Sequence, residues 1–319
     1  MANSISANSA PSSITASTPA KTVTVPNARN DQAEAWLENQ KGLLLPINYF
    51  MVTFTLPEEL RSLARSHQKT VYNILFRTSA EALLELASDP RFVGGKIGMV
   101  GVLHTWTRDL FYHPHVHYVA TGSGLSPDGQ WLNSRQDFLV HVKPLSVLFR
   151  AKFRDQLKKT DLFPLVDQHT WNKDWVVHCQ PVGTGEAAFK YLAPYIFRVA
   201  ISNKRILKLE DGRVTFSYKE SATDQVKFST ISAEEFIRRF LQHVLPDHFV
   251  KVRYYGLLSP ANRHLLEKAR ELLGAKPADN LTSTQSQQDN QPIAALRCPN
   301  CGSILKLIQR LKPQIRWPP

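Results

Sequence analysis

Residues 113–121 read HPHVHYVAT, and this stretch is the most informative in the chain. Its β-branched and aromatic residues favour a strand, in which residues two apart share one face. His115 and His117 are therefore expected to project together. His113 has the same parity, but Pro114 cannot donate to a sheet ladder and predicts that the regular strand begins just after it. His113 is thus a weaker member of the set.

Two imidazoles at this spacing can bind one divalent cation, because neutral histidine is a common metal ligand. A third ligand is needed, and the sequence leaves three candidates open: His104, Asp109 and Glu186. The competing interpretation is a row of exposed histidines on a polar strand face.

The rest of the chain alternates between strand and helix patterns. Strands are expected over 49–56, 96–106, 115–121, 175–180 and 250–255, with a β-hairpin or meander over 205–231. Helices are expected over 57–64, 70–87, 145–159 and 262–273, and from about 185 through the tyrosines at 191 and 195. Another helix should begin at Ser232, since Glu235 three residues later completes a capping box. Interleaved elements with short turns indicate an α+β or α/β fold.

Composition narrows the class of protein. The chain has 319 residues and a formal net charge of +12, which favours a polyanionic partner such as nucleic acid. Three cysteines form no disulfide framework and fit a reducing cytoplasm. No signal peptide or membrane-spanning run is evident, which argues against a secreted or membrane protein.

Three regions are expected along the chain. Residues 1–34 are rich in Ser, Ala, Thr and Asn and are predicted to be disordered, residues 35–275 form the folded domain, and residues 276–319 form a polar linker and a basic tail. The tail carries Cys298 and Cys301, which are half of a structural zinc site; an unmetallated remnant is the alternative.

Tyr191 and Tyr195 are separated by four residues and share a face if they lie on a helix. A phenol with a pKa near ~10 is a weak nucleophile at neutral pH. A nearby cation can polarise a scissile phosphate and stabilise the phenolate. Taken alone, such a pair is more often a packing feature. Pro194 between them predicts a kink, or a helix that begins near it.

Together these motifs resemble the two-tyrosine HUH transposases of rolling-circle insertion sequences. His115-Val116-His117 is similar to the HUH motif of that family, and Tyr191-Leu192-Ala193-Pro194-Tyr195 is similar to its tyrosine helix. Further similar stretches are 43–61, 113–131, 190–206 and CPNCG at 298–302. The family usually has an N-terminal cysteine-rich zinc-binding segment, and residues 1–35 contain no cysteine.

The resemblance implies both a fold and a reaction. The fold is α+β, an antiparallel sheet with packed helices. His115 and His117 are implied to hold Mg²⁺ or Mn²⁺, and Tyr191 and Tyr195 to attack single-stranded DNA at transposon ends and target, forming 5′-phosphotyrosine links. The implied protein is a metal-dependent nickase and strand transferase of the bacterial cytoplasm, associated with the nucleoid.

Other residues are candidates for DNA contact. Arg198, Asn203, Lys204 and Arg205 follow the tyrosines closely and are expected to touch phosphates, and Trp106 could stack on an unpaired base. Two alternatives to the transposase stay open: a catalytically decayed remnant that only binds DNA, and a hydrolase of small phosphoesters. The second lacks support, because no carboxylate cluster or phosphate-binding glycine loop accompanies the histidines.

Overall fold

The computed structural model describes residues 36–38, 40, 43–184, 187, 189–190, 196, 200–220 and 223–275. The chain divides into two compact units, Met1–Ala278 and Asp279–Pro319, and the second lies outside the described residues. Residues 1–34 also lie outside them, so the predicted boundaries of the N-terminal segment and of the linker and tail stay predictions.

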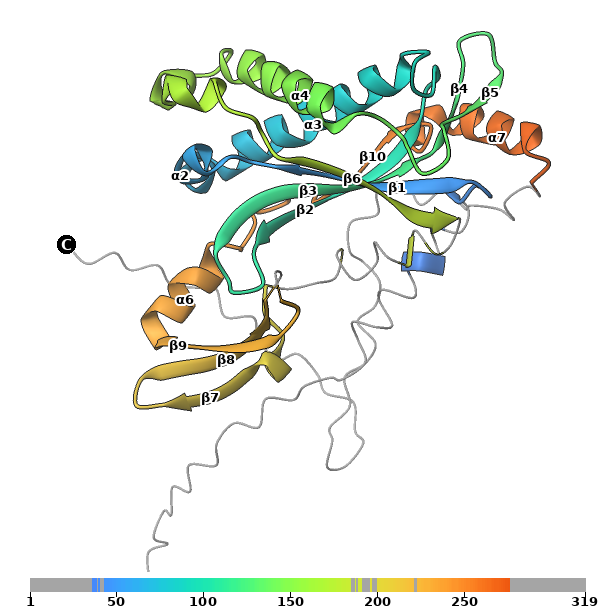
Figure 1. Ribbon diagram of the computed structural model, residues 1–319. Helices are drawn as coiled ribbons and strands as arrows, with labels where there is room; N and C mark the ends of the chain where they lie inside the picture. Colours follow the sequence, from blue (N-terminus) through green and yellow to red (C-terminus); the bar gives the residue numbers. More distant parts are fainter. Residues whose placement is uncertain are drawn as a thin grey trace, which may run out of the picture. The chain divides into compact units, whose positions relative to one another are not determined.

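A five-stranded antiparallel sheet forms the centre of the first unit, in the order β10-β2-β3-β1-β6 (Figure 1). Its strands are β1 (Asn48–Thr55), β2 (Gly98–Trp106), β3 (Tyr112–Thr121), β6 (Val177–Thr184) and β10 (Val252–Gly256). All five strands overlap the segments that the sequence pattern predicts, although β6 and β10 begin and end later, and β3 begins earlier, than expected. The α+β fold with an antiparallel sheet is confirmed.

The three central strands, β1, β2 and β3, bury side chains on both faces of the sheet. Phe50, Val52 and Phe54 of β1 point to one face and pack with α3 (Gln68–Ser88) and α4 (Val142–Leu157). Figure 1 shows these two helices lying along the same face. α2 (Arg61–Ser66) precedes α3 and contributes Ala64 to the same cluster.

The opposite face of the sheet carries the alternate residues of the same strands. Met51, Val100 and Val119 pack there with Leu266 of α7 (Arg263–Leu272). Phe189 and Ile196 belong to this second cluster as well. The strands are therefore apolar on both sides, which explains why β1 reads as a nearly continuous hydrophobic run.

Two elements that contain a proline begin earlier than expected. α4 begins at Val142, ahead of Pro144, because proline is tolerated in the first turn of a helix, where its missing N–H has no partner to lose. β3 begins at Tyr112 and includes Pro114, so the prediction of a strand starting after the proline is wrong. The register of β2 against β3 shifts between His104 and Trp106, and this bulge accommodates a residue that cannot donate.

Smaller elements complete the unit. A three-stranded antiparallel sheet contains β7 (Ile206–Glu210), β8 (Arg213–Lys219) and β9 (Val226–Ser232), and a hairpin contains β4 (Ser123–Leu125) and β5 (Trp131–Asn133). The 3-10 turns are η2 (Glu58–Leu60), η3 (Phe163–Leu165), η4 (Gln168–Trp171), η5 (Asn203–Arg205) and η6 (Pro260–Asn262).

The predicted meander and the helix after it are confirmed. α6 (Ala233–Leu241) is capped by Ser232, whose hydroxyl accepts a hydrogen bond from the Glu235 N–H at 3.2 Å. Phe216 of β8 and Phe236 of α6 pack with Leu110, in the turn between β2 and β3. Among the described residues, no helix combines the length and apolar character that a bilayer crossing requires.

Candidate metal centre

Three histidines come together on the β2–β3 hairpin. His104 of β2 lies directly opposite His115 of β3, and His117 is two residues further along β3. Opposite residues in an antiparallel pair share a face, as do residues two apart on one strand. In each ring one nitrogen could bind a metal, and these three nitrogens lie within 4.8 Å of one another, a span that one cation can bridge with small side-chain movements.

Hydrogen bonds orient the two β3 imidazoles. The Nδ1–H of His115 donates to the backbone carbonyl of His113 at 2.6 Å, which leaves Nε2 of His115 with its lone pair free of a proton. Nδ1 of His117 shares a 2.9 Å hydrogen bond with the hydroxyl of Thr53, its neighbour across the β1–β3 pair. Contacts of this kind orient metal-ligating rings and raise their basicity.

Packing holds the third ring. His104 is only 3% exposed, and its imidazole stacks on the indole of Trp106 with ring centroids 4.9 Å apart and an interplanar angle of 17°. His104 meets His117 at 5.0 Å and His115 at 5.5 Å between centroids, in both cases edge to face. The strand pairing, the hydrogen bonds and the ring contacts thus hold all three imidazoles in place.

The site keeps His115 and His117 neutral. Burial, followed by the neighbouring His117, lowers the pKa of His115 to about 3. Burial also lowers the pKa of His117 to about 3, with a smaller effect from His104. Neutral imidazoles carry the lone pairs that a cation needs, so the cluster can bind a metal at neutral pH without first losing protons.

Comparison with known proteins identifies the family. Residues 98–265, which include all three histidines, match the family model Y2_Tnp, described as "Putative transposase". The chain belongs to this transposase family.

Two relatives agree with this assignment. "Putative transposase y4qJ" of Sinorhizobium fredii is 41% identical over 275 residues, covering 79% of this chain and 69% of the relative. The transposase for insertion sequence element IS801 of Pseudomonas savastanoi pv. phaseolicola is 26% identical over 303 residues, covering 87% of this chain and 72% of the relative.

Solved structures with partial likeness are conjugative relaxases. TrwC in complex with oriT DNA, in a metal-bound structure, is 17% identical with a TM-score of 0.28, covering 35% of this chain and 43% of the relaxase. TrwC with a 27-mer DNA is 12% identical with a TM-score of 0.29, covering 72% of this chain and 75% of the relaxase. TM-scores of this size indicate a limited likeness.

His113 stands apart from the histidine triad of the transposase. Its Nδ1 accepts a 2.9 Å hydrogen bond from Nη2 of Arg61, which can only donate. In a neutral ring the proton then sits on Nε2, so neither nitrogen offers a lone pair to a metal. Burial, followed by the charge of Arg61, lowers the pKa of His113 and keeps the ring neutral.

The other two candidates for the third ligand are placed differently. Asp109 lies in the turn between β2 and β3, where its carboxylate accepts a 2.5 Å hydrogen bond from the hydroxyl of Thr107. Glu186 lies outside the described residues. Of the three candidates, the structure groups His104 with His115 and His117.

The sequence contains a signal for His104 in the length of the connection between the two predicted strands. If 96–106 and 115–121 are strands of one antiparallel hairpin whose turn is centred on Asp109 and Leu110, His104 must pair with His115. The chain turns at Leu110, which has a positive φ of 69°. The register of the two strands follows from the length of their connection, and the residues next to His104 do not indicate which residue it pairs with.

The tyrosines Tyr191 and Tyr195, with Arg198, Cys298 and Cys301, lie outside the described residues. The residues on either side of the tyrosine pair, Phe189 and Ile196, are buried in the cluster on the sheet face that carries the histidine triad.

The described members of the expected DNA-contacting group lie at η5. Asn203 and Lys204 are exposed there. The guanidinium of Arg205 donates to the carbonyl of Ser217 at 2.7 Å and also to that of Arg108, so it links β8 to the β2–β3 turn. Contact of these three residues with DNA stays a prediction.

Cys179 lies in β6, as expected, and is a free thiol. Burial raises the pKa of this thiol to about 11, which disfavours the thiolate that zinc requires. Cys179 is therefore a poor partner for the cysteine pair of the tail.

Proposed function

We propose that this transposase nicks and rejoins single-stranded DNA at transposon ends and target, with His104, His115 and His117 holding a divalent cation and Tyr191 and Tyr195 acting as nucleophiles. The observation that carries the proposal is the triad of imidazoles on one hairpin, on the sheet face where residues flanking the tyrosine pair are buried. Membership of a transposase family supplies the DNA context.

The donor set fits a cation. Three imidazoles with oriented rings suit a first-row transition ion, and a site without a carboxylate in its described part favours Mn²⁺ over Mg²⁺, which prefers oxygen ligands. When bound, the cation would polarise the scissile phosphate and stabilise the charge that develops on its oxygens. His104, His115 and His117 would hold it, while Thr53 and the His113 carbonyl keep two of the rings oriented.

The tyrosines would carry the covalent step. The phenolic oxygen of Tyr191 or Tyr195 attacks phosphorus, the bond from phosphorus to the 3′-oxygen breaks, and the DNA leaves with a free 3′-hydroxyl. The proton lost by the phenol balances the one gained by the 3′-oxygen. The 5′-phosphotyrosine keeps the energy of the phosphodiester, so a later 3′-hydroxyl can attack it and restore the tyrosine. Two tyrosines would allow two DNA ends to be held in turn.

A DNA substrate would place this enzyme at the bacterial nucleoid. Exposed Asn203 and Lys204 near the β2–β3 turn, with Arg198 and Arg205, would contribute contacts to phosphates, and binding should weaken with salt.

A covalent-capture assay tests the proposal. The protein is incubated with labelled single-stranded DNA carrying the end sequence of its own element and with Mn²⁺, then separated on a denaturing gel. A shifted band is expected for the wild type, for Tyr191→Phe and for Tyr195→Phe, but not for the double variant. His117→Ala should lose the band, whereas His113→Ala, which changes a neighbouring histidine outside the triad, should keep it.

Two results would contradict the proposal. DNA binding without any shifted band would identify a remnant that binds but no longer cuts. A band that survives in His117→Ala would separate the tyrosine chemistry from the histidine site.

A further inference from the structure

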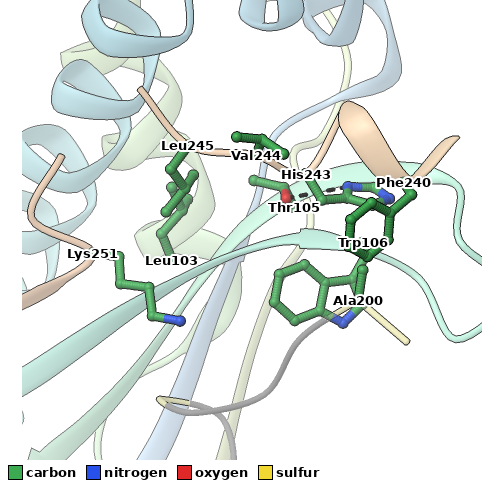
Figure 2. A pocket seen from close by; sticks show the side chains of 9 residues that line it. All are labelled: Leu103, Thr105, Trp106, Ala200, Phe240, His243, Val244, Leu245 and Lys251. Carbon is green, nitrogen blue, oxygen red and sulfur yellow. Dashed lines mark hydrogen bonds between the residues drawn. The ribbon is translucent and has the colours of Figure 1, made fainter. Parts of the chain in front are cut away.

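A pocket opens at the sheet edge where β10 leaves β2. β10 pairs with β2 from Gly98 to Val102, and the last contact is a 3.0 Å hydrogen bond from the Leu103 N–H to the Lys251 carbonyl. Beyond that point β2 continues to Trp106, and the segment after α6 lies across the gap. The pocket has a volume of about 170 Å³. Its lining residues are Leu103, Thr105, Trp106, Ala200, Phe240, His243, Val244, Leu245 and Lys251 (Figure 2).

The pocket shares one residue with the surroundings of the triad. Trp106 stacks against His104 on one side and lines the pocket as well. The ring of His243 meets the same indole edge to face at 5.9 Å. The pocket is thus separated from the proposed metal centre by a single aromatic ring.

The walls of the pocket are mostly apolar, and one charged group enters it. Leu103, Phe240, Val244 and the indole of Trp106 provide apolar surface. In Figure 2 the ammonium end of Lys251 points toward the indole. Burial lowers the pKa of Lys251, and within the described part of the chain no ion pair is found for its ammonium.

The side chains of Thr105 and His243 already have hydrogen-bonding partners. The Thr105 hydroxyl and Nδ1 of His243 share a 3.3 Å hydrogen bond, and Nε2 of His243 lies 3.3 Å from the Leu110 carbonyl. A ligand for this pocket therefore needs apolar faces and an edge that accepts from Lys251. An unpaired nucleobase has both properties, because its faces stack on aromatic rings and its carbonyl oxygens accept hydrogen bonds.

We propose that this pocket binds one unpaired base, preferably one with a carbonyl edge, of the DNA strand that the triad acts on. The proposal rests on the function proposed above. Stacking near Trp106 and a hydrogen bond from Lys251 would anchor the strand next to the triad. The anchored base would then fix which phosphate reaches the metal centre, and the pocket would contribute to the choice of cleavage position.

Binding measurements without catalysis test the pocket. The probes are a twelve-residue oligothymidylate and an abasic strand of the same length and charge, each labelled for fluorescence anisotropy, in the presence of a chelator. The variants are Val244→Trp, which fills the pocket from an exposed position, and Lys251→Met, which removes the charge but keeps the length. Lys159→Met is the matched control, since it removes one exposed charge beyond the end of α4.

The wild type should prefer the thymidylate strand to the abasic strand, and Val244→Trp should reduce that preference by about tenfold, the size expected when one stacked base is lost. Lys251→Met should reduce it as well, whereas Lys159→Met should weaken both probes alike. A strand of 5-iododeoxyuridine, crosslinked by light and mapped by mass spectrometry, should form its adduct at Trp106 or Phe240. Thermal unfolding checks that each variant is folded.

The outcomes separate this proposal from the proposed function. Equal weakening of both probes by Val244→Trp, or adducts only outside the pocket, would overturn base binding even if covalent capture succeeds. Base-dependent binding that is lost in Val244→Trp supports the pocket even if no covalent product forms. Binding of free thymidine as tight as that of the strand would overturn the link to DNA and indicate a nucleotide site.

Discussion

Removing His104 should abolish most of the Mn²⁺ affinity that we propose for this protein, because His104 is the one histidine of the triad that comes from β2. His104→Ala leaves His115 and His117 in place on β3 and opens a gap at a buried position. Loss of a hydrogen-bonding partner behind a ligand already costs about 10–100-fold in metal affinity, so loss of the ligand itself should cost at least about 100-fold.

The size of the effect follows from binding linkage. At a Mn²⁺ concentration about 100 times the wild-type dissociation constant, binding stabilises the folded protein by about 2.7 kcal/mol, and a 100-fold weaker site gains only about 0.4 kcal/mol. For a folded part of about 150–250 residues, each 1 kcal/mol shifts the melting temperature by about 2–4 °C. The wild type should therefore gain about 5–10 °C from Mn²⁺, and His104→Ala about 1 °C.

Thermal unfolding with and without Mn²⁺ measures this difference without needing DNA or activity. His113→Ala is the control, because it removes a neighbouring histidine whose nitrogens are committed elsewhere. A full Mn²⁺ shift in His104→Ala would refute the assignment of the third ligand. Loss of the Mn²⁺-induced rise in melting temperature in His113→Ala would refute the exclusion of His113 as a ligand.

Three further outcomes are expected. Thr53→Val removes the hydroxyl that bonds His117 and should weaken Mn²⁺ binding by about tenfold in isothermal titration, with little change in stability of the metal-free protein. Burial lowers the pKa of His243 from 6.5 to about 4, so the unfolded chain binds more protons than the folded protein below pH 6.5. Protonation of this residue should therefore lower the free energy of unfolding by about 2 kcal/mol as the pH falls from 7.5 to 5. Urea unfolding of the wild type should show that loss, and His243→Phe should lack this part of it. Gly101→Ala would place a methyl group against Cε1 of the fully buried Tyr118. The variant should be less stable than the wild type by about 1–3 kcal/mol in the same urea assay. An unchanged urea midpoint would mean that the tyrosine ring can move aside.

Most of the fold could be predicted from the sequence, because its elements carry strong local signals. The alternation in β8 and the cap at Ser232 each depend on residues close in the chain, and both are found where expected. The start of β3 could not be predicted in this way. Pro114 is a poor strand residue by itself, and it is accommodated by a shift in register against β2 that only the folded sheet supplies.

The candidate site likewise contains residues that the sequence predicts and residues that it does not. The shared face of His115 and His117 follows from strand periodicity, which two neighbouring residues on one strand suffice to reveal. Membership of His104 depends on a pairing between strands, and the exclusion of His113 depends on Arg61, which lies on α2 and is 52 residues away in the chain. The pairing follows from the register of one hairpin, whereas the Arg61–His113 contact is set by tertiary packing that no local pattern encodes.

The β2–β3 hairpin contains every ligand of the triad within a short stretch of chain. The two strands are joined by Thr107–Phe111, so the coordinating geometry depends on a single local loop closure and on no distant docking event. The remainder of the sheet contributes burial and ring orientation to ligands whose spacing the hairpin already sets. A histidine cluster built on one hairpin can thus keep its spacing when other parts of the protein change, as long as those few residues keep their register.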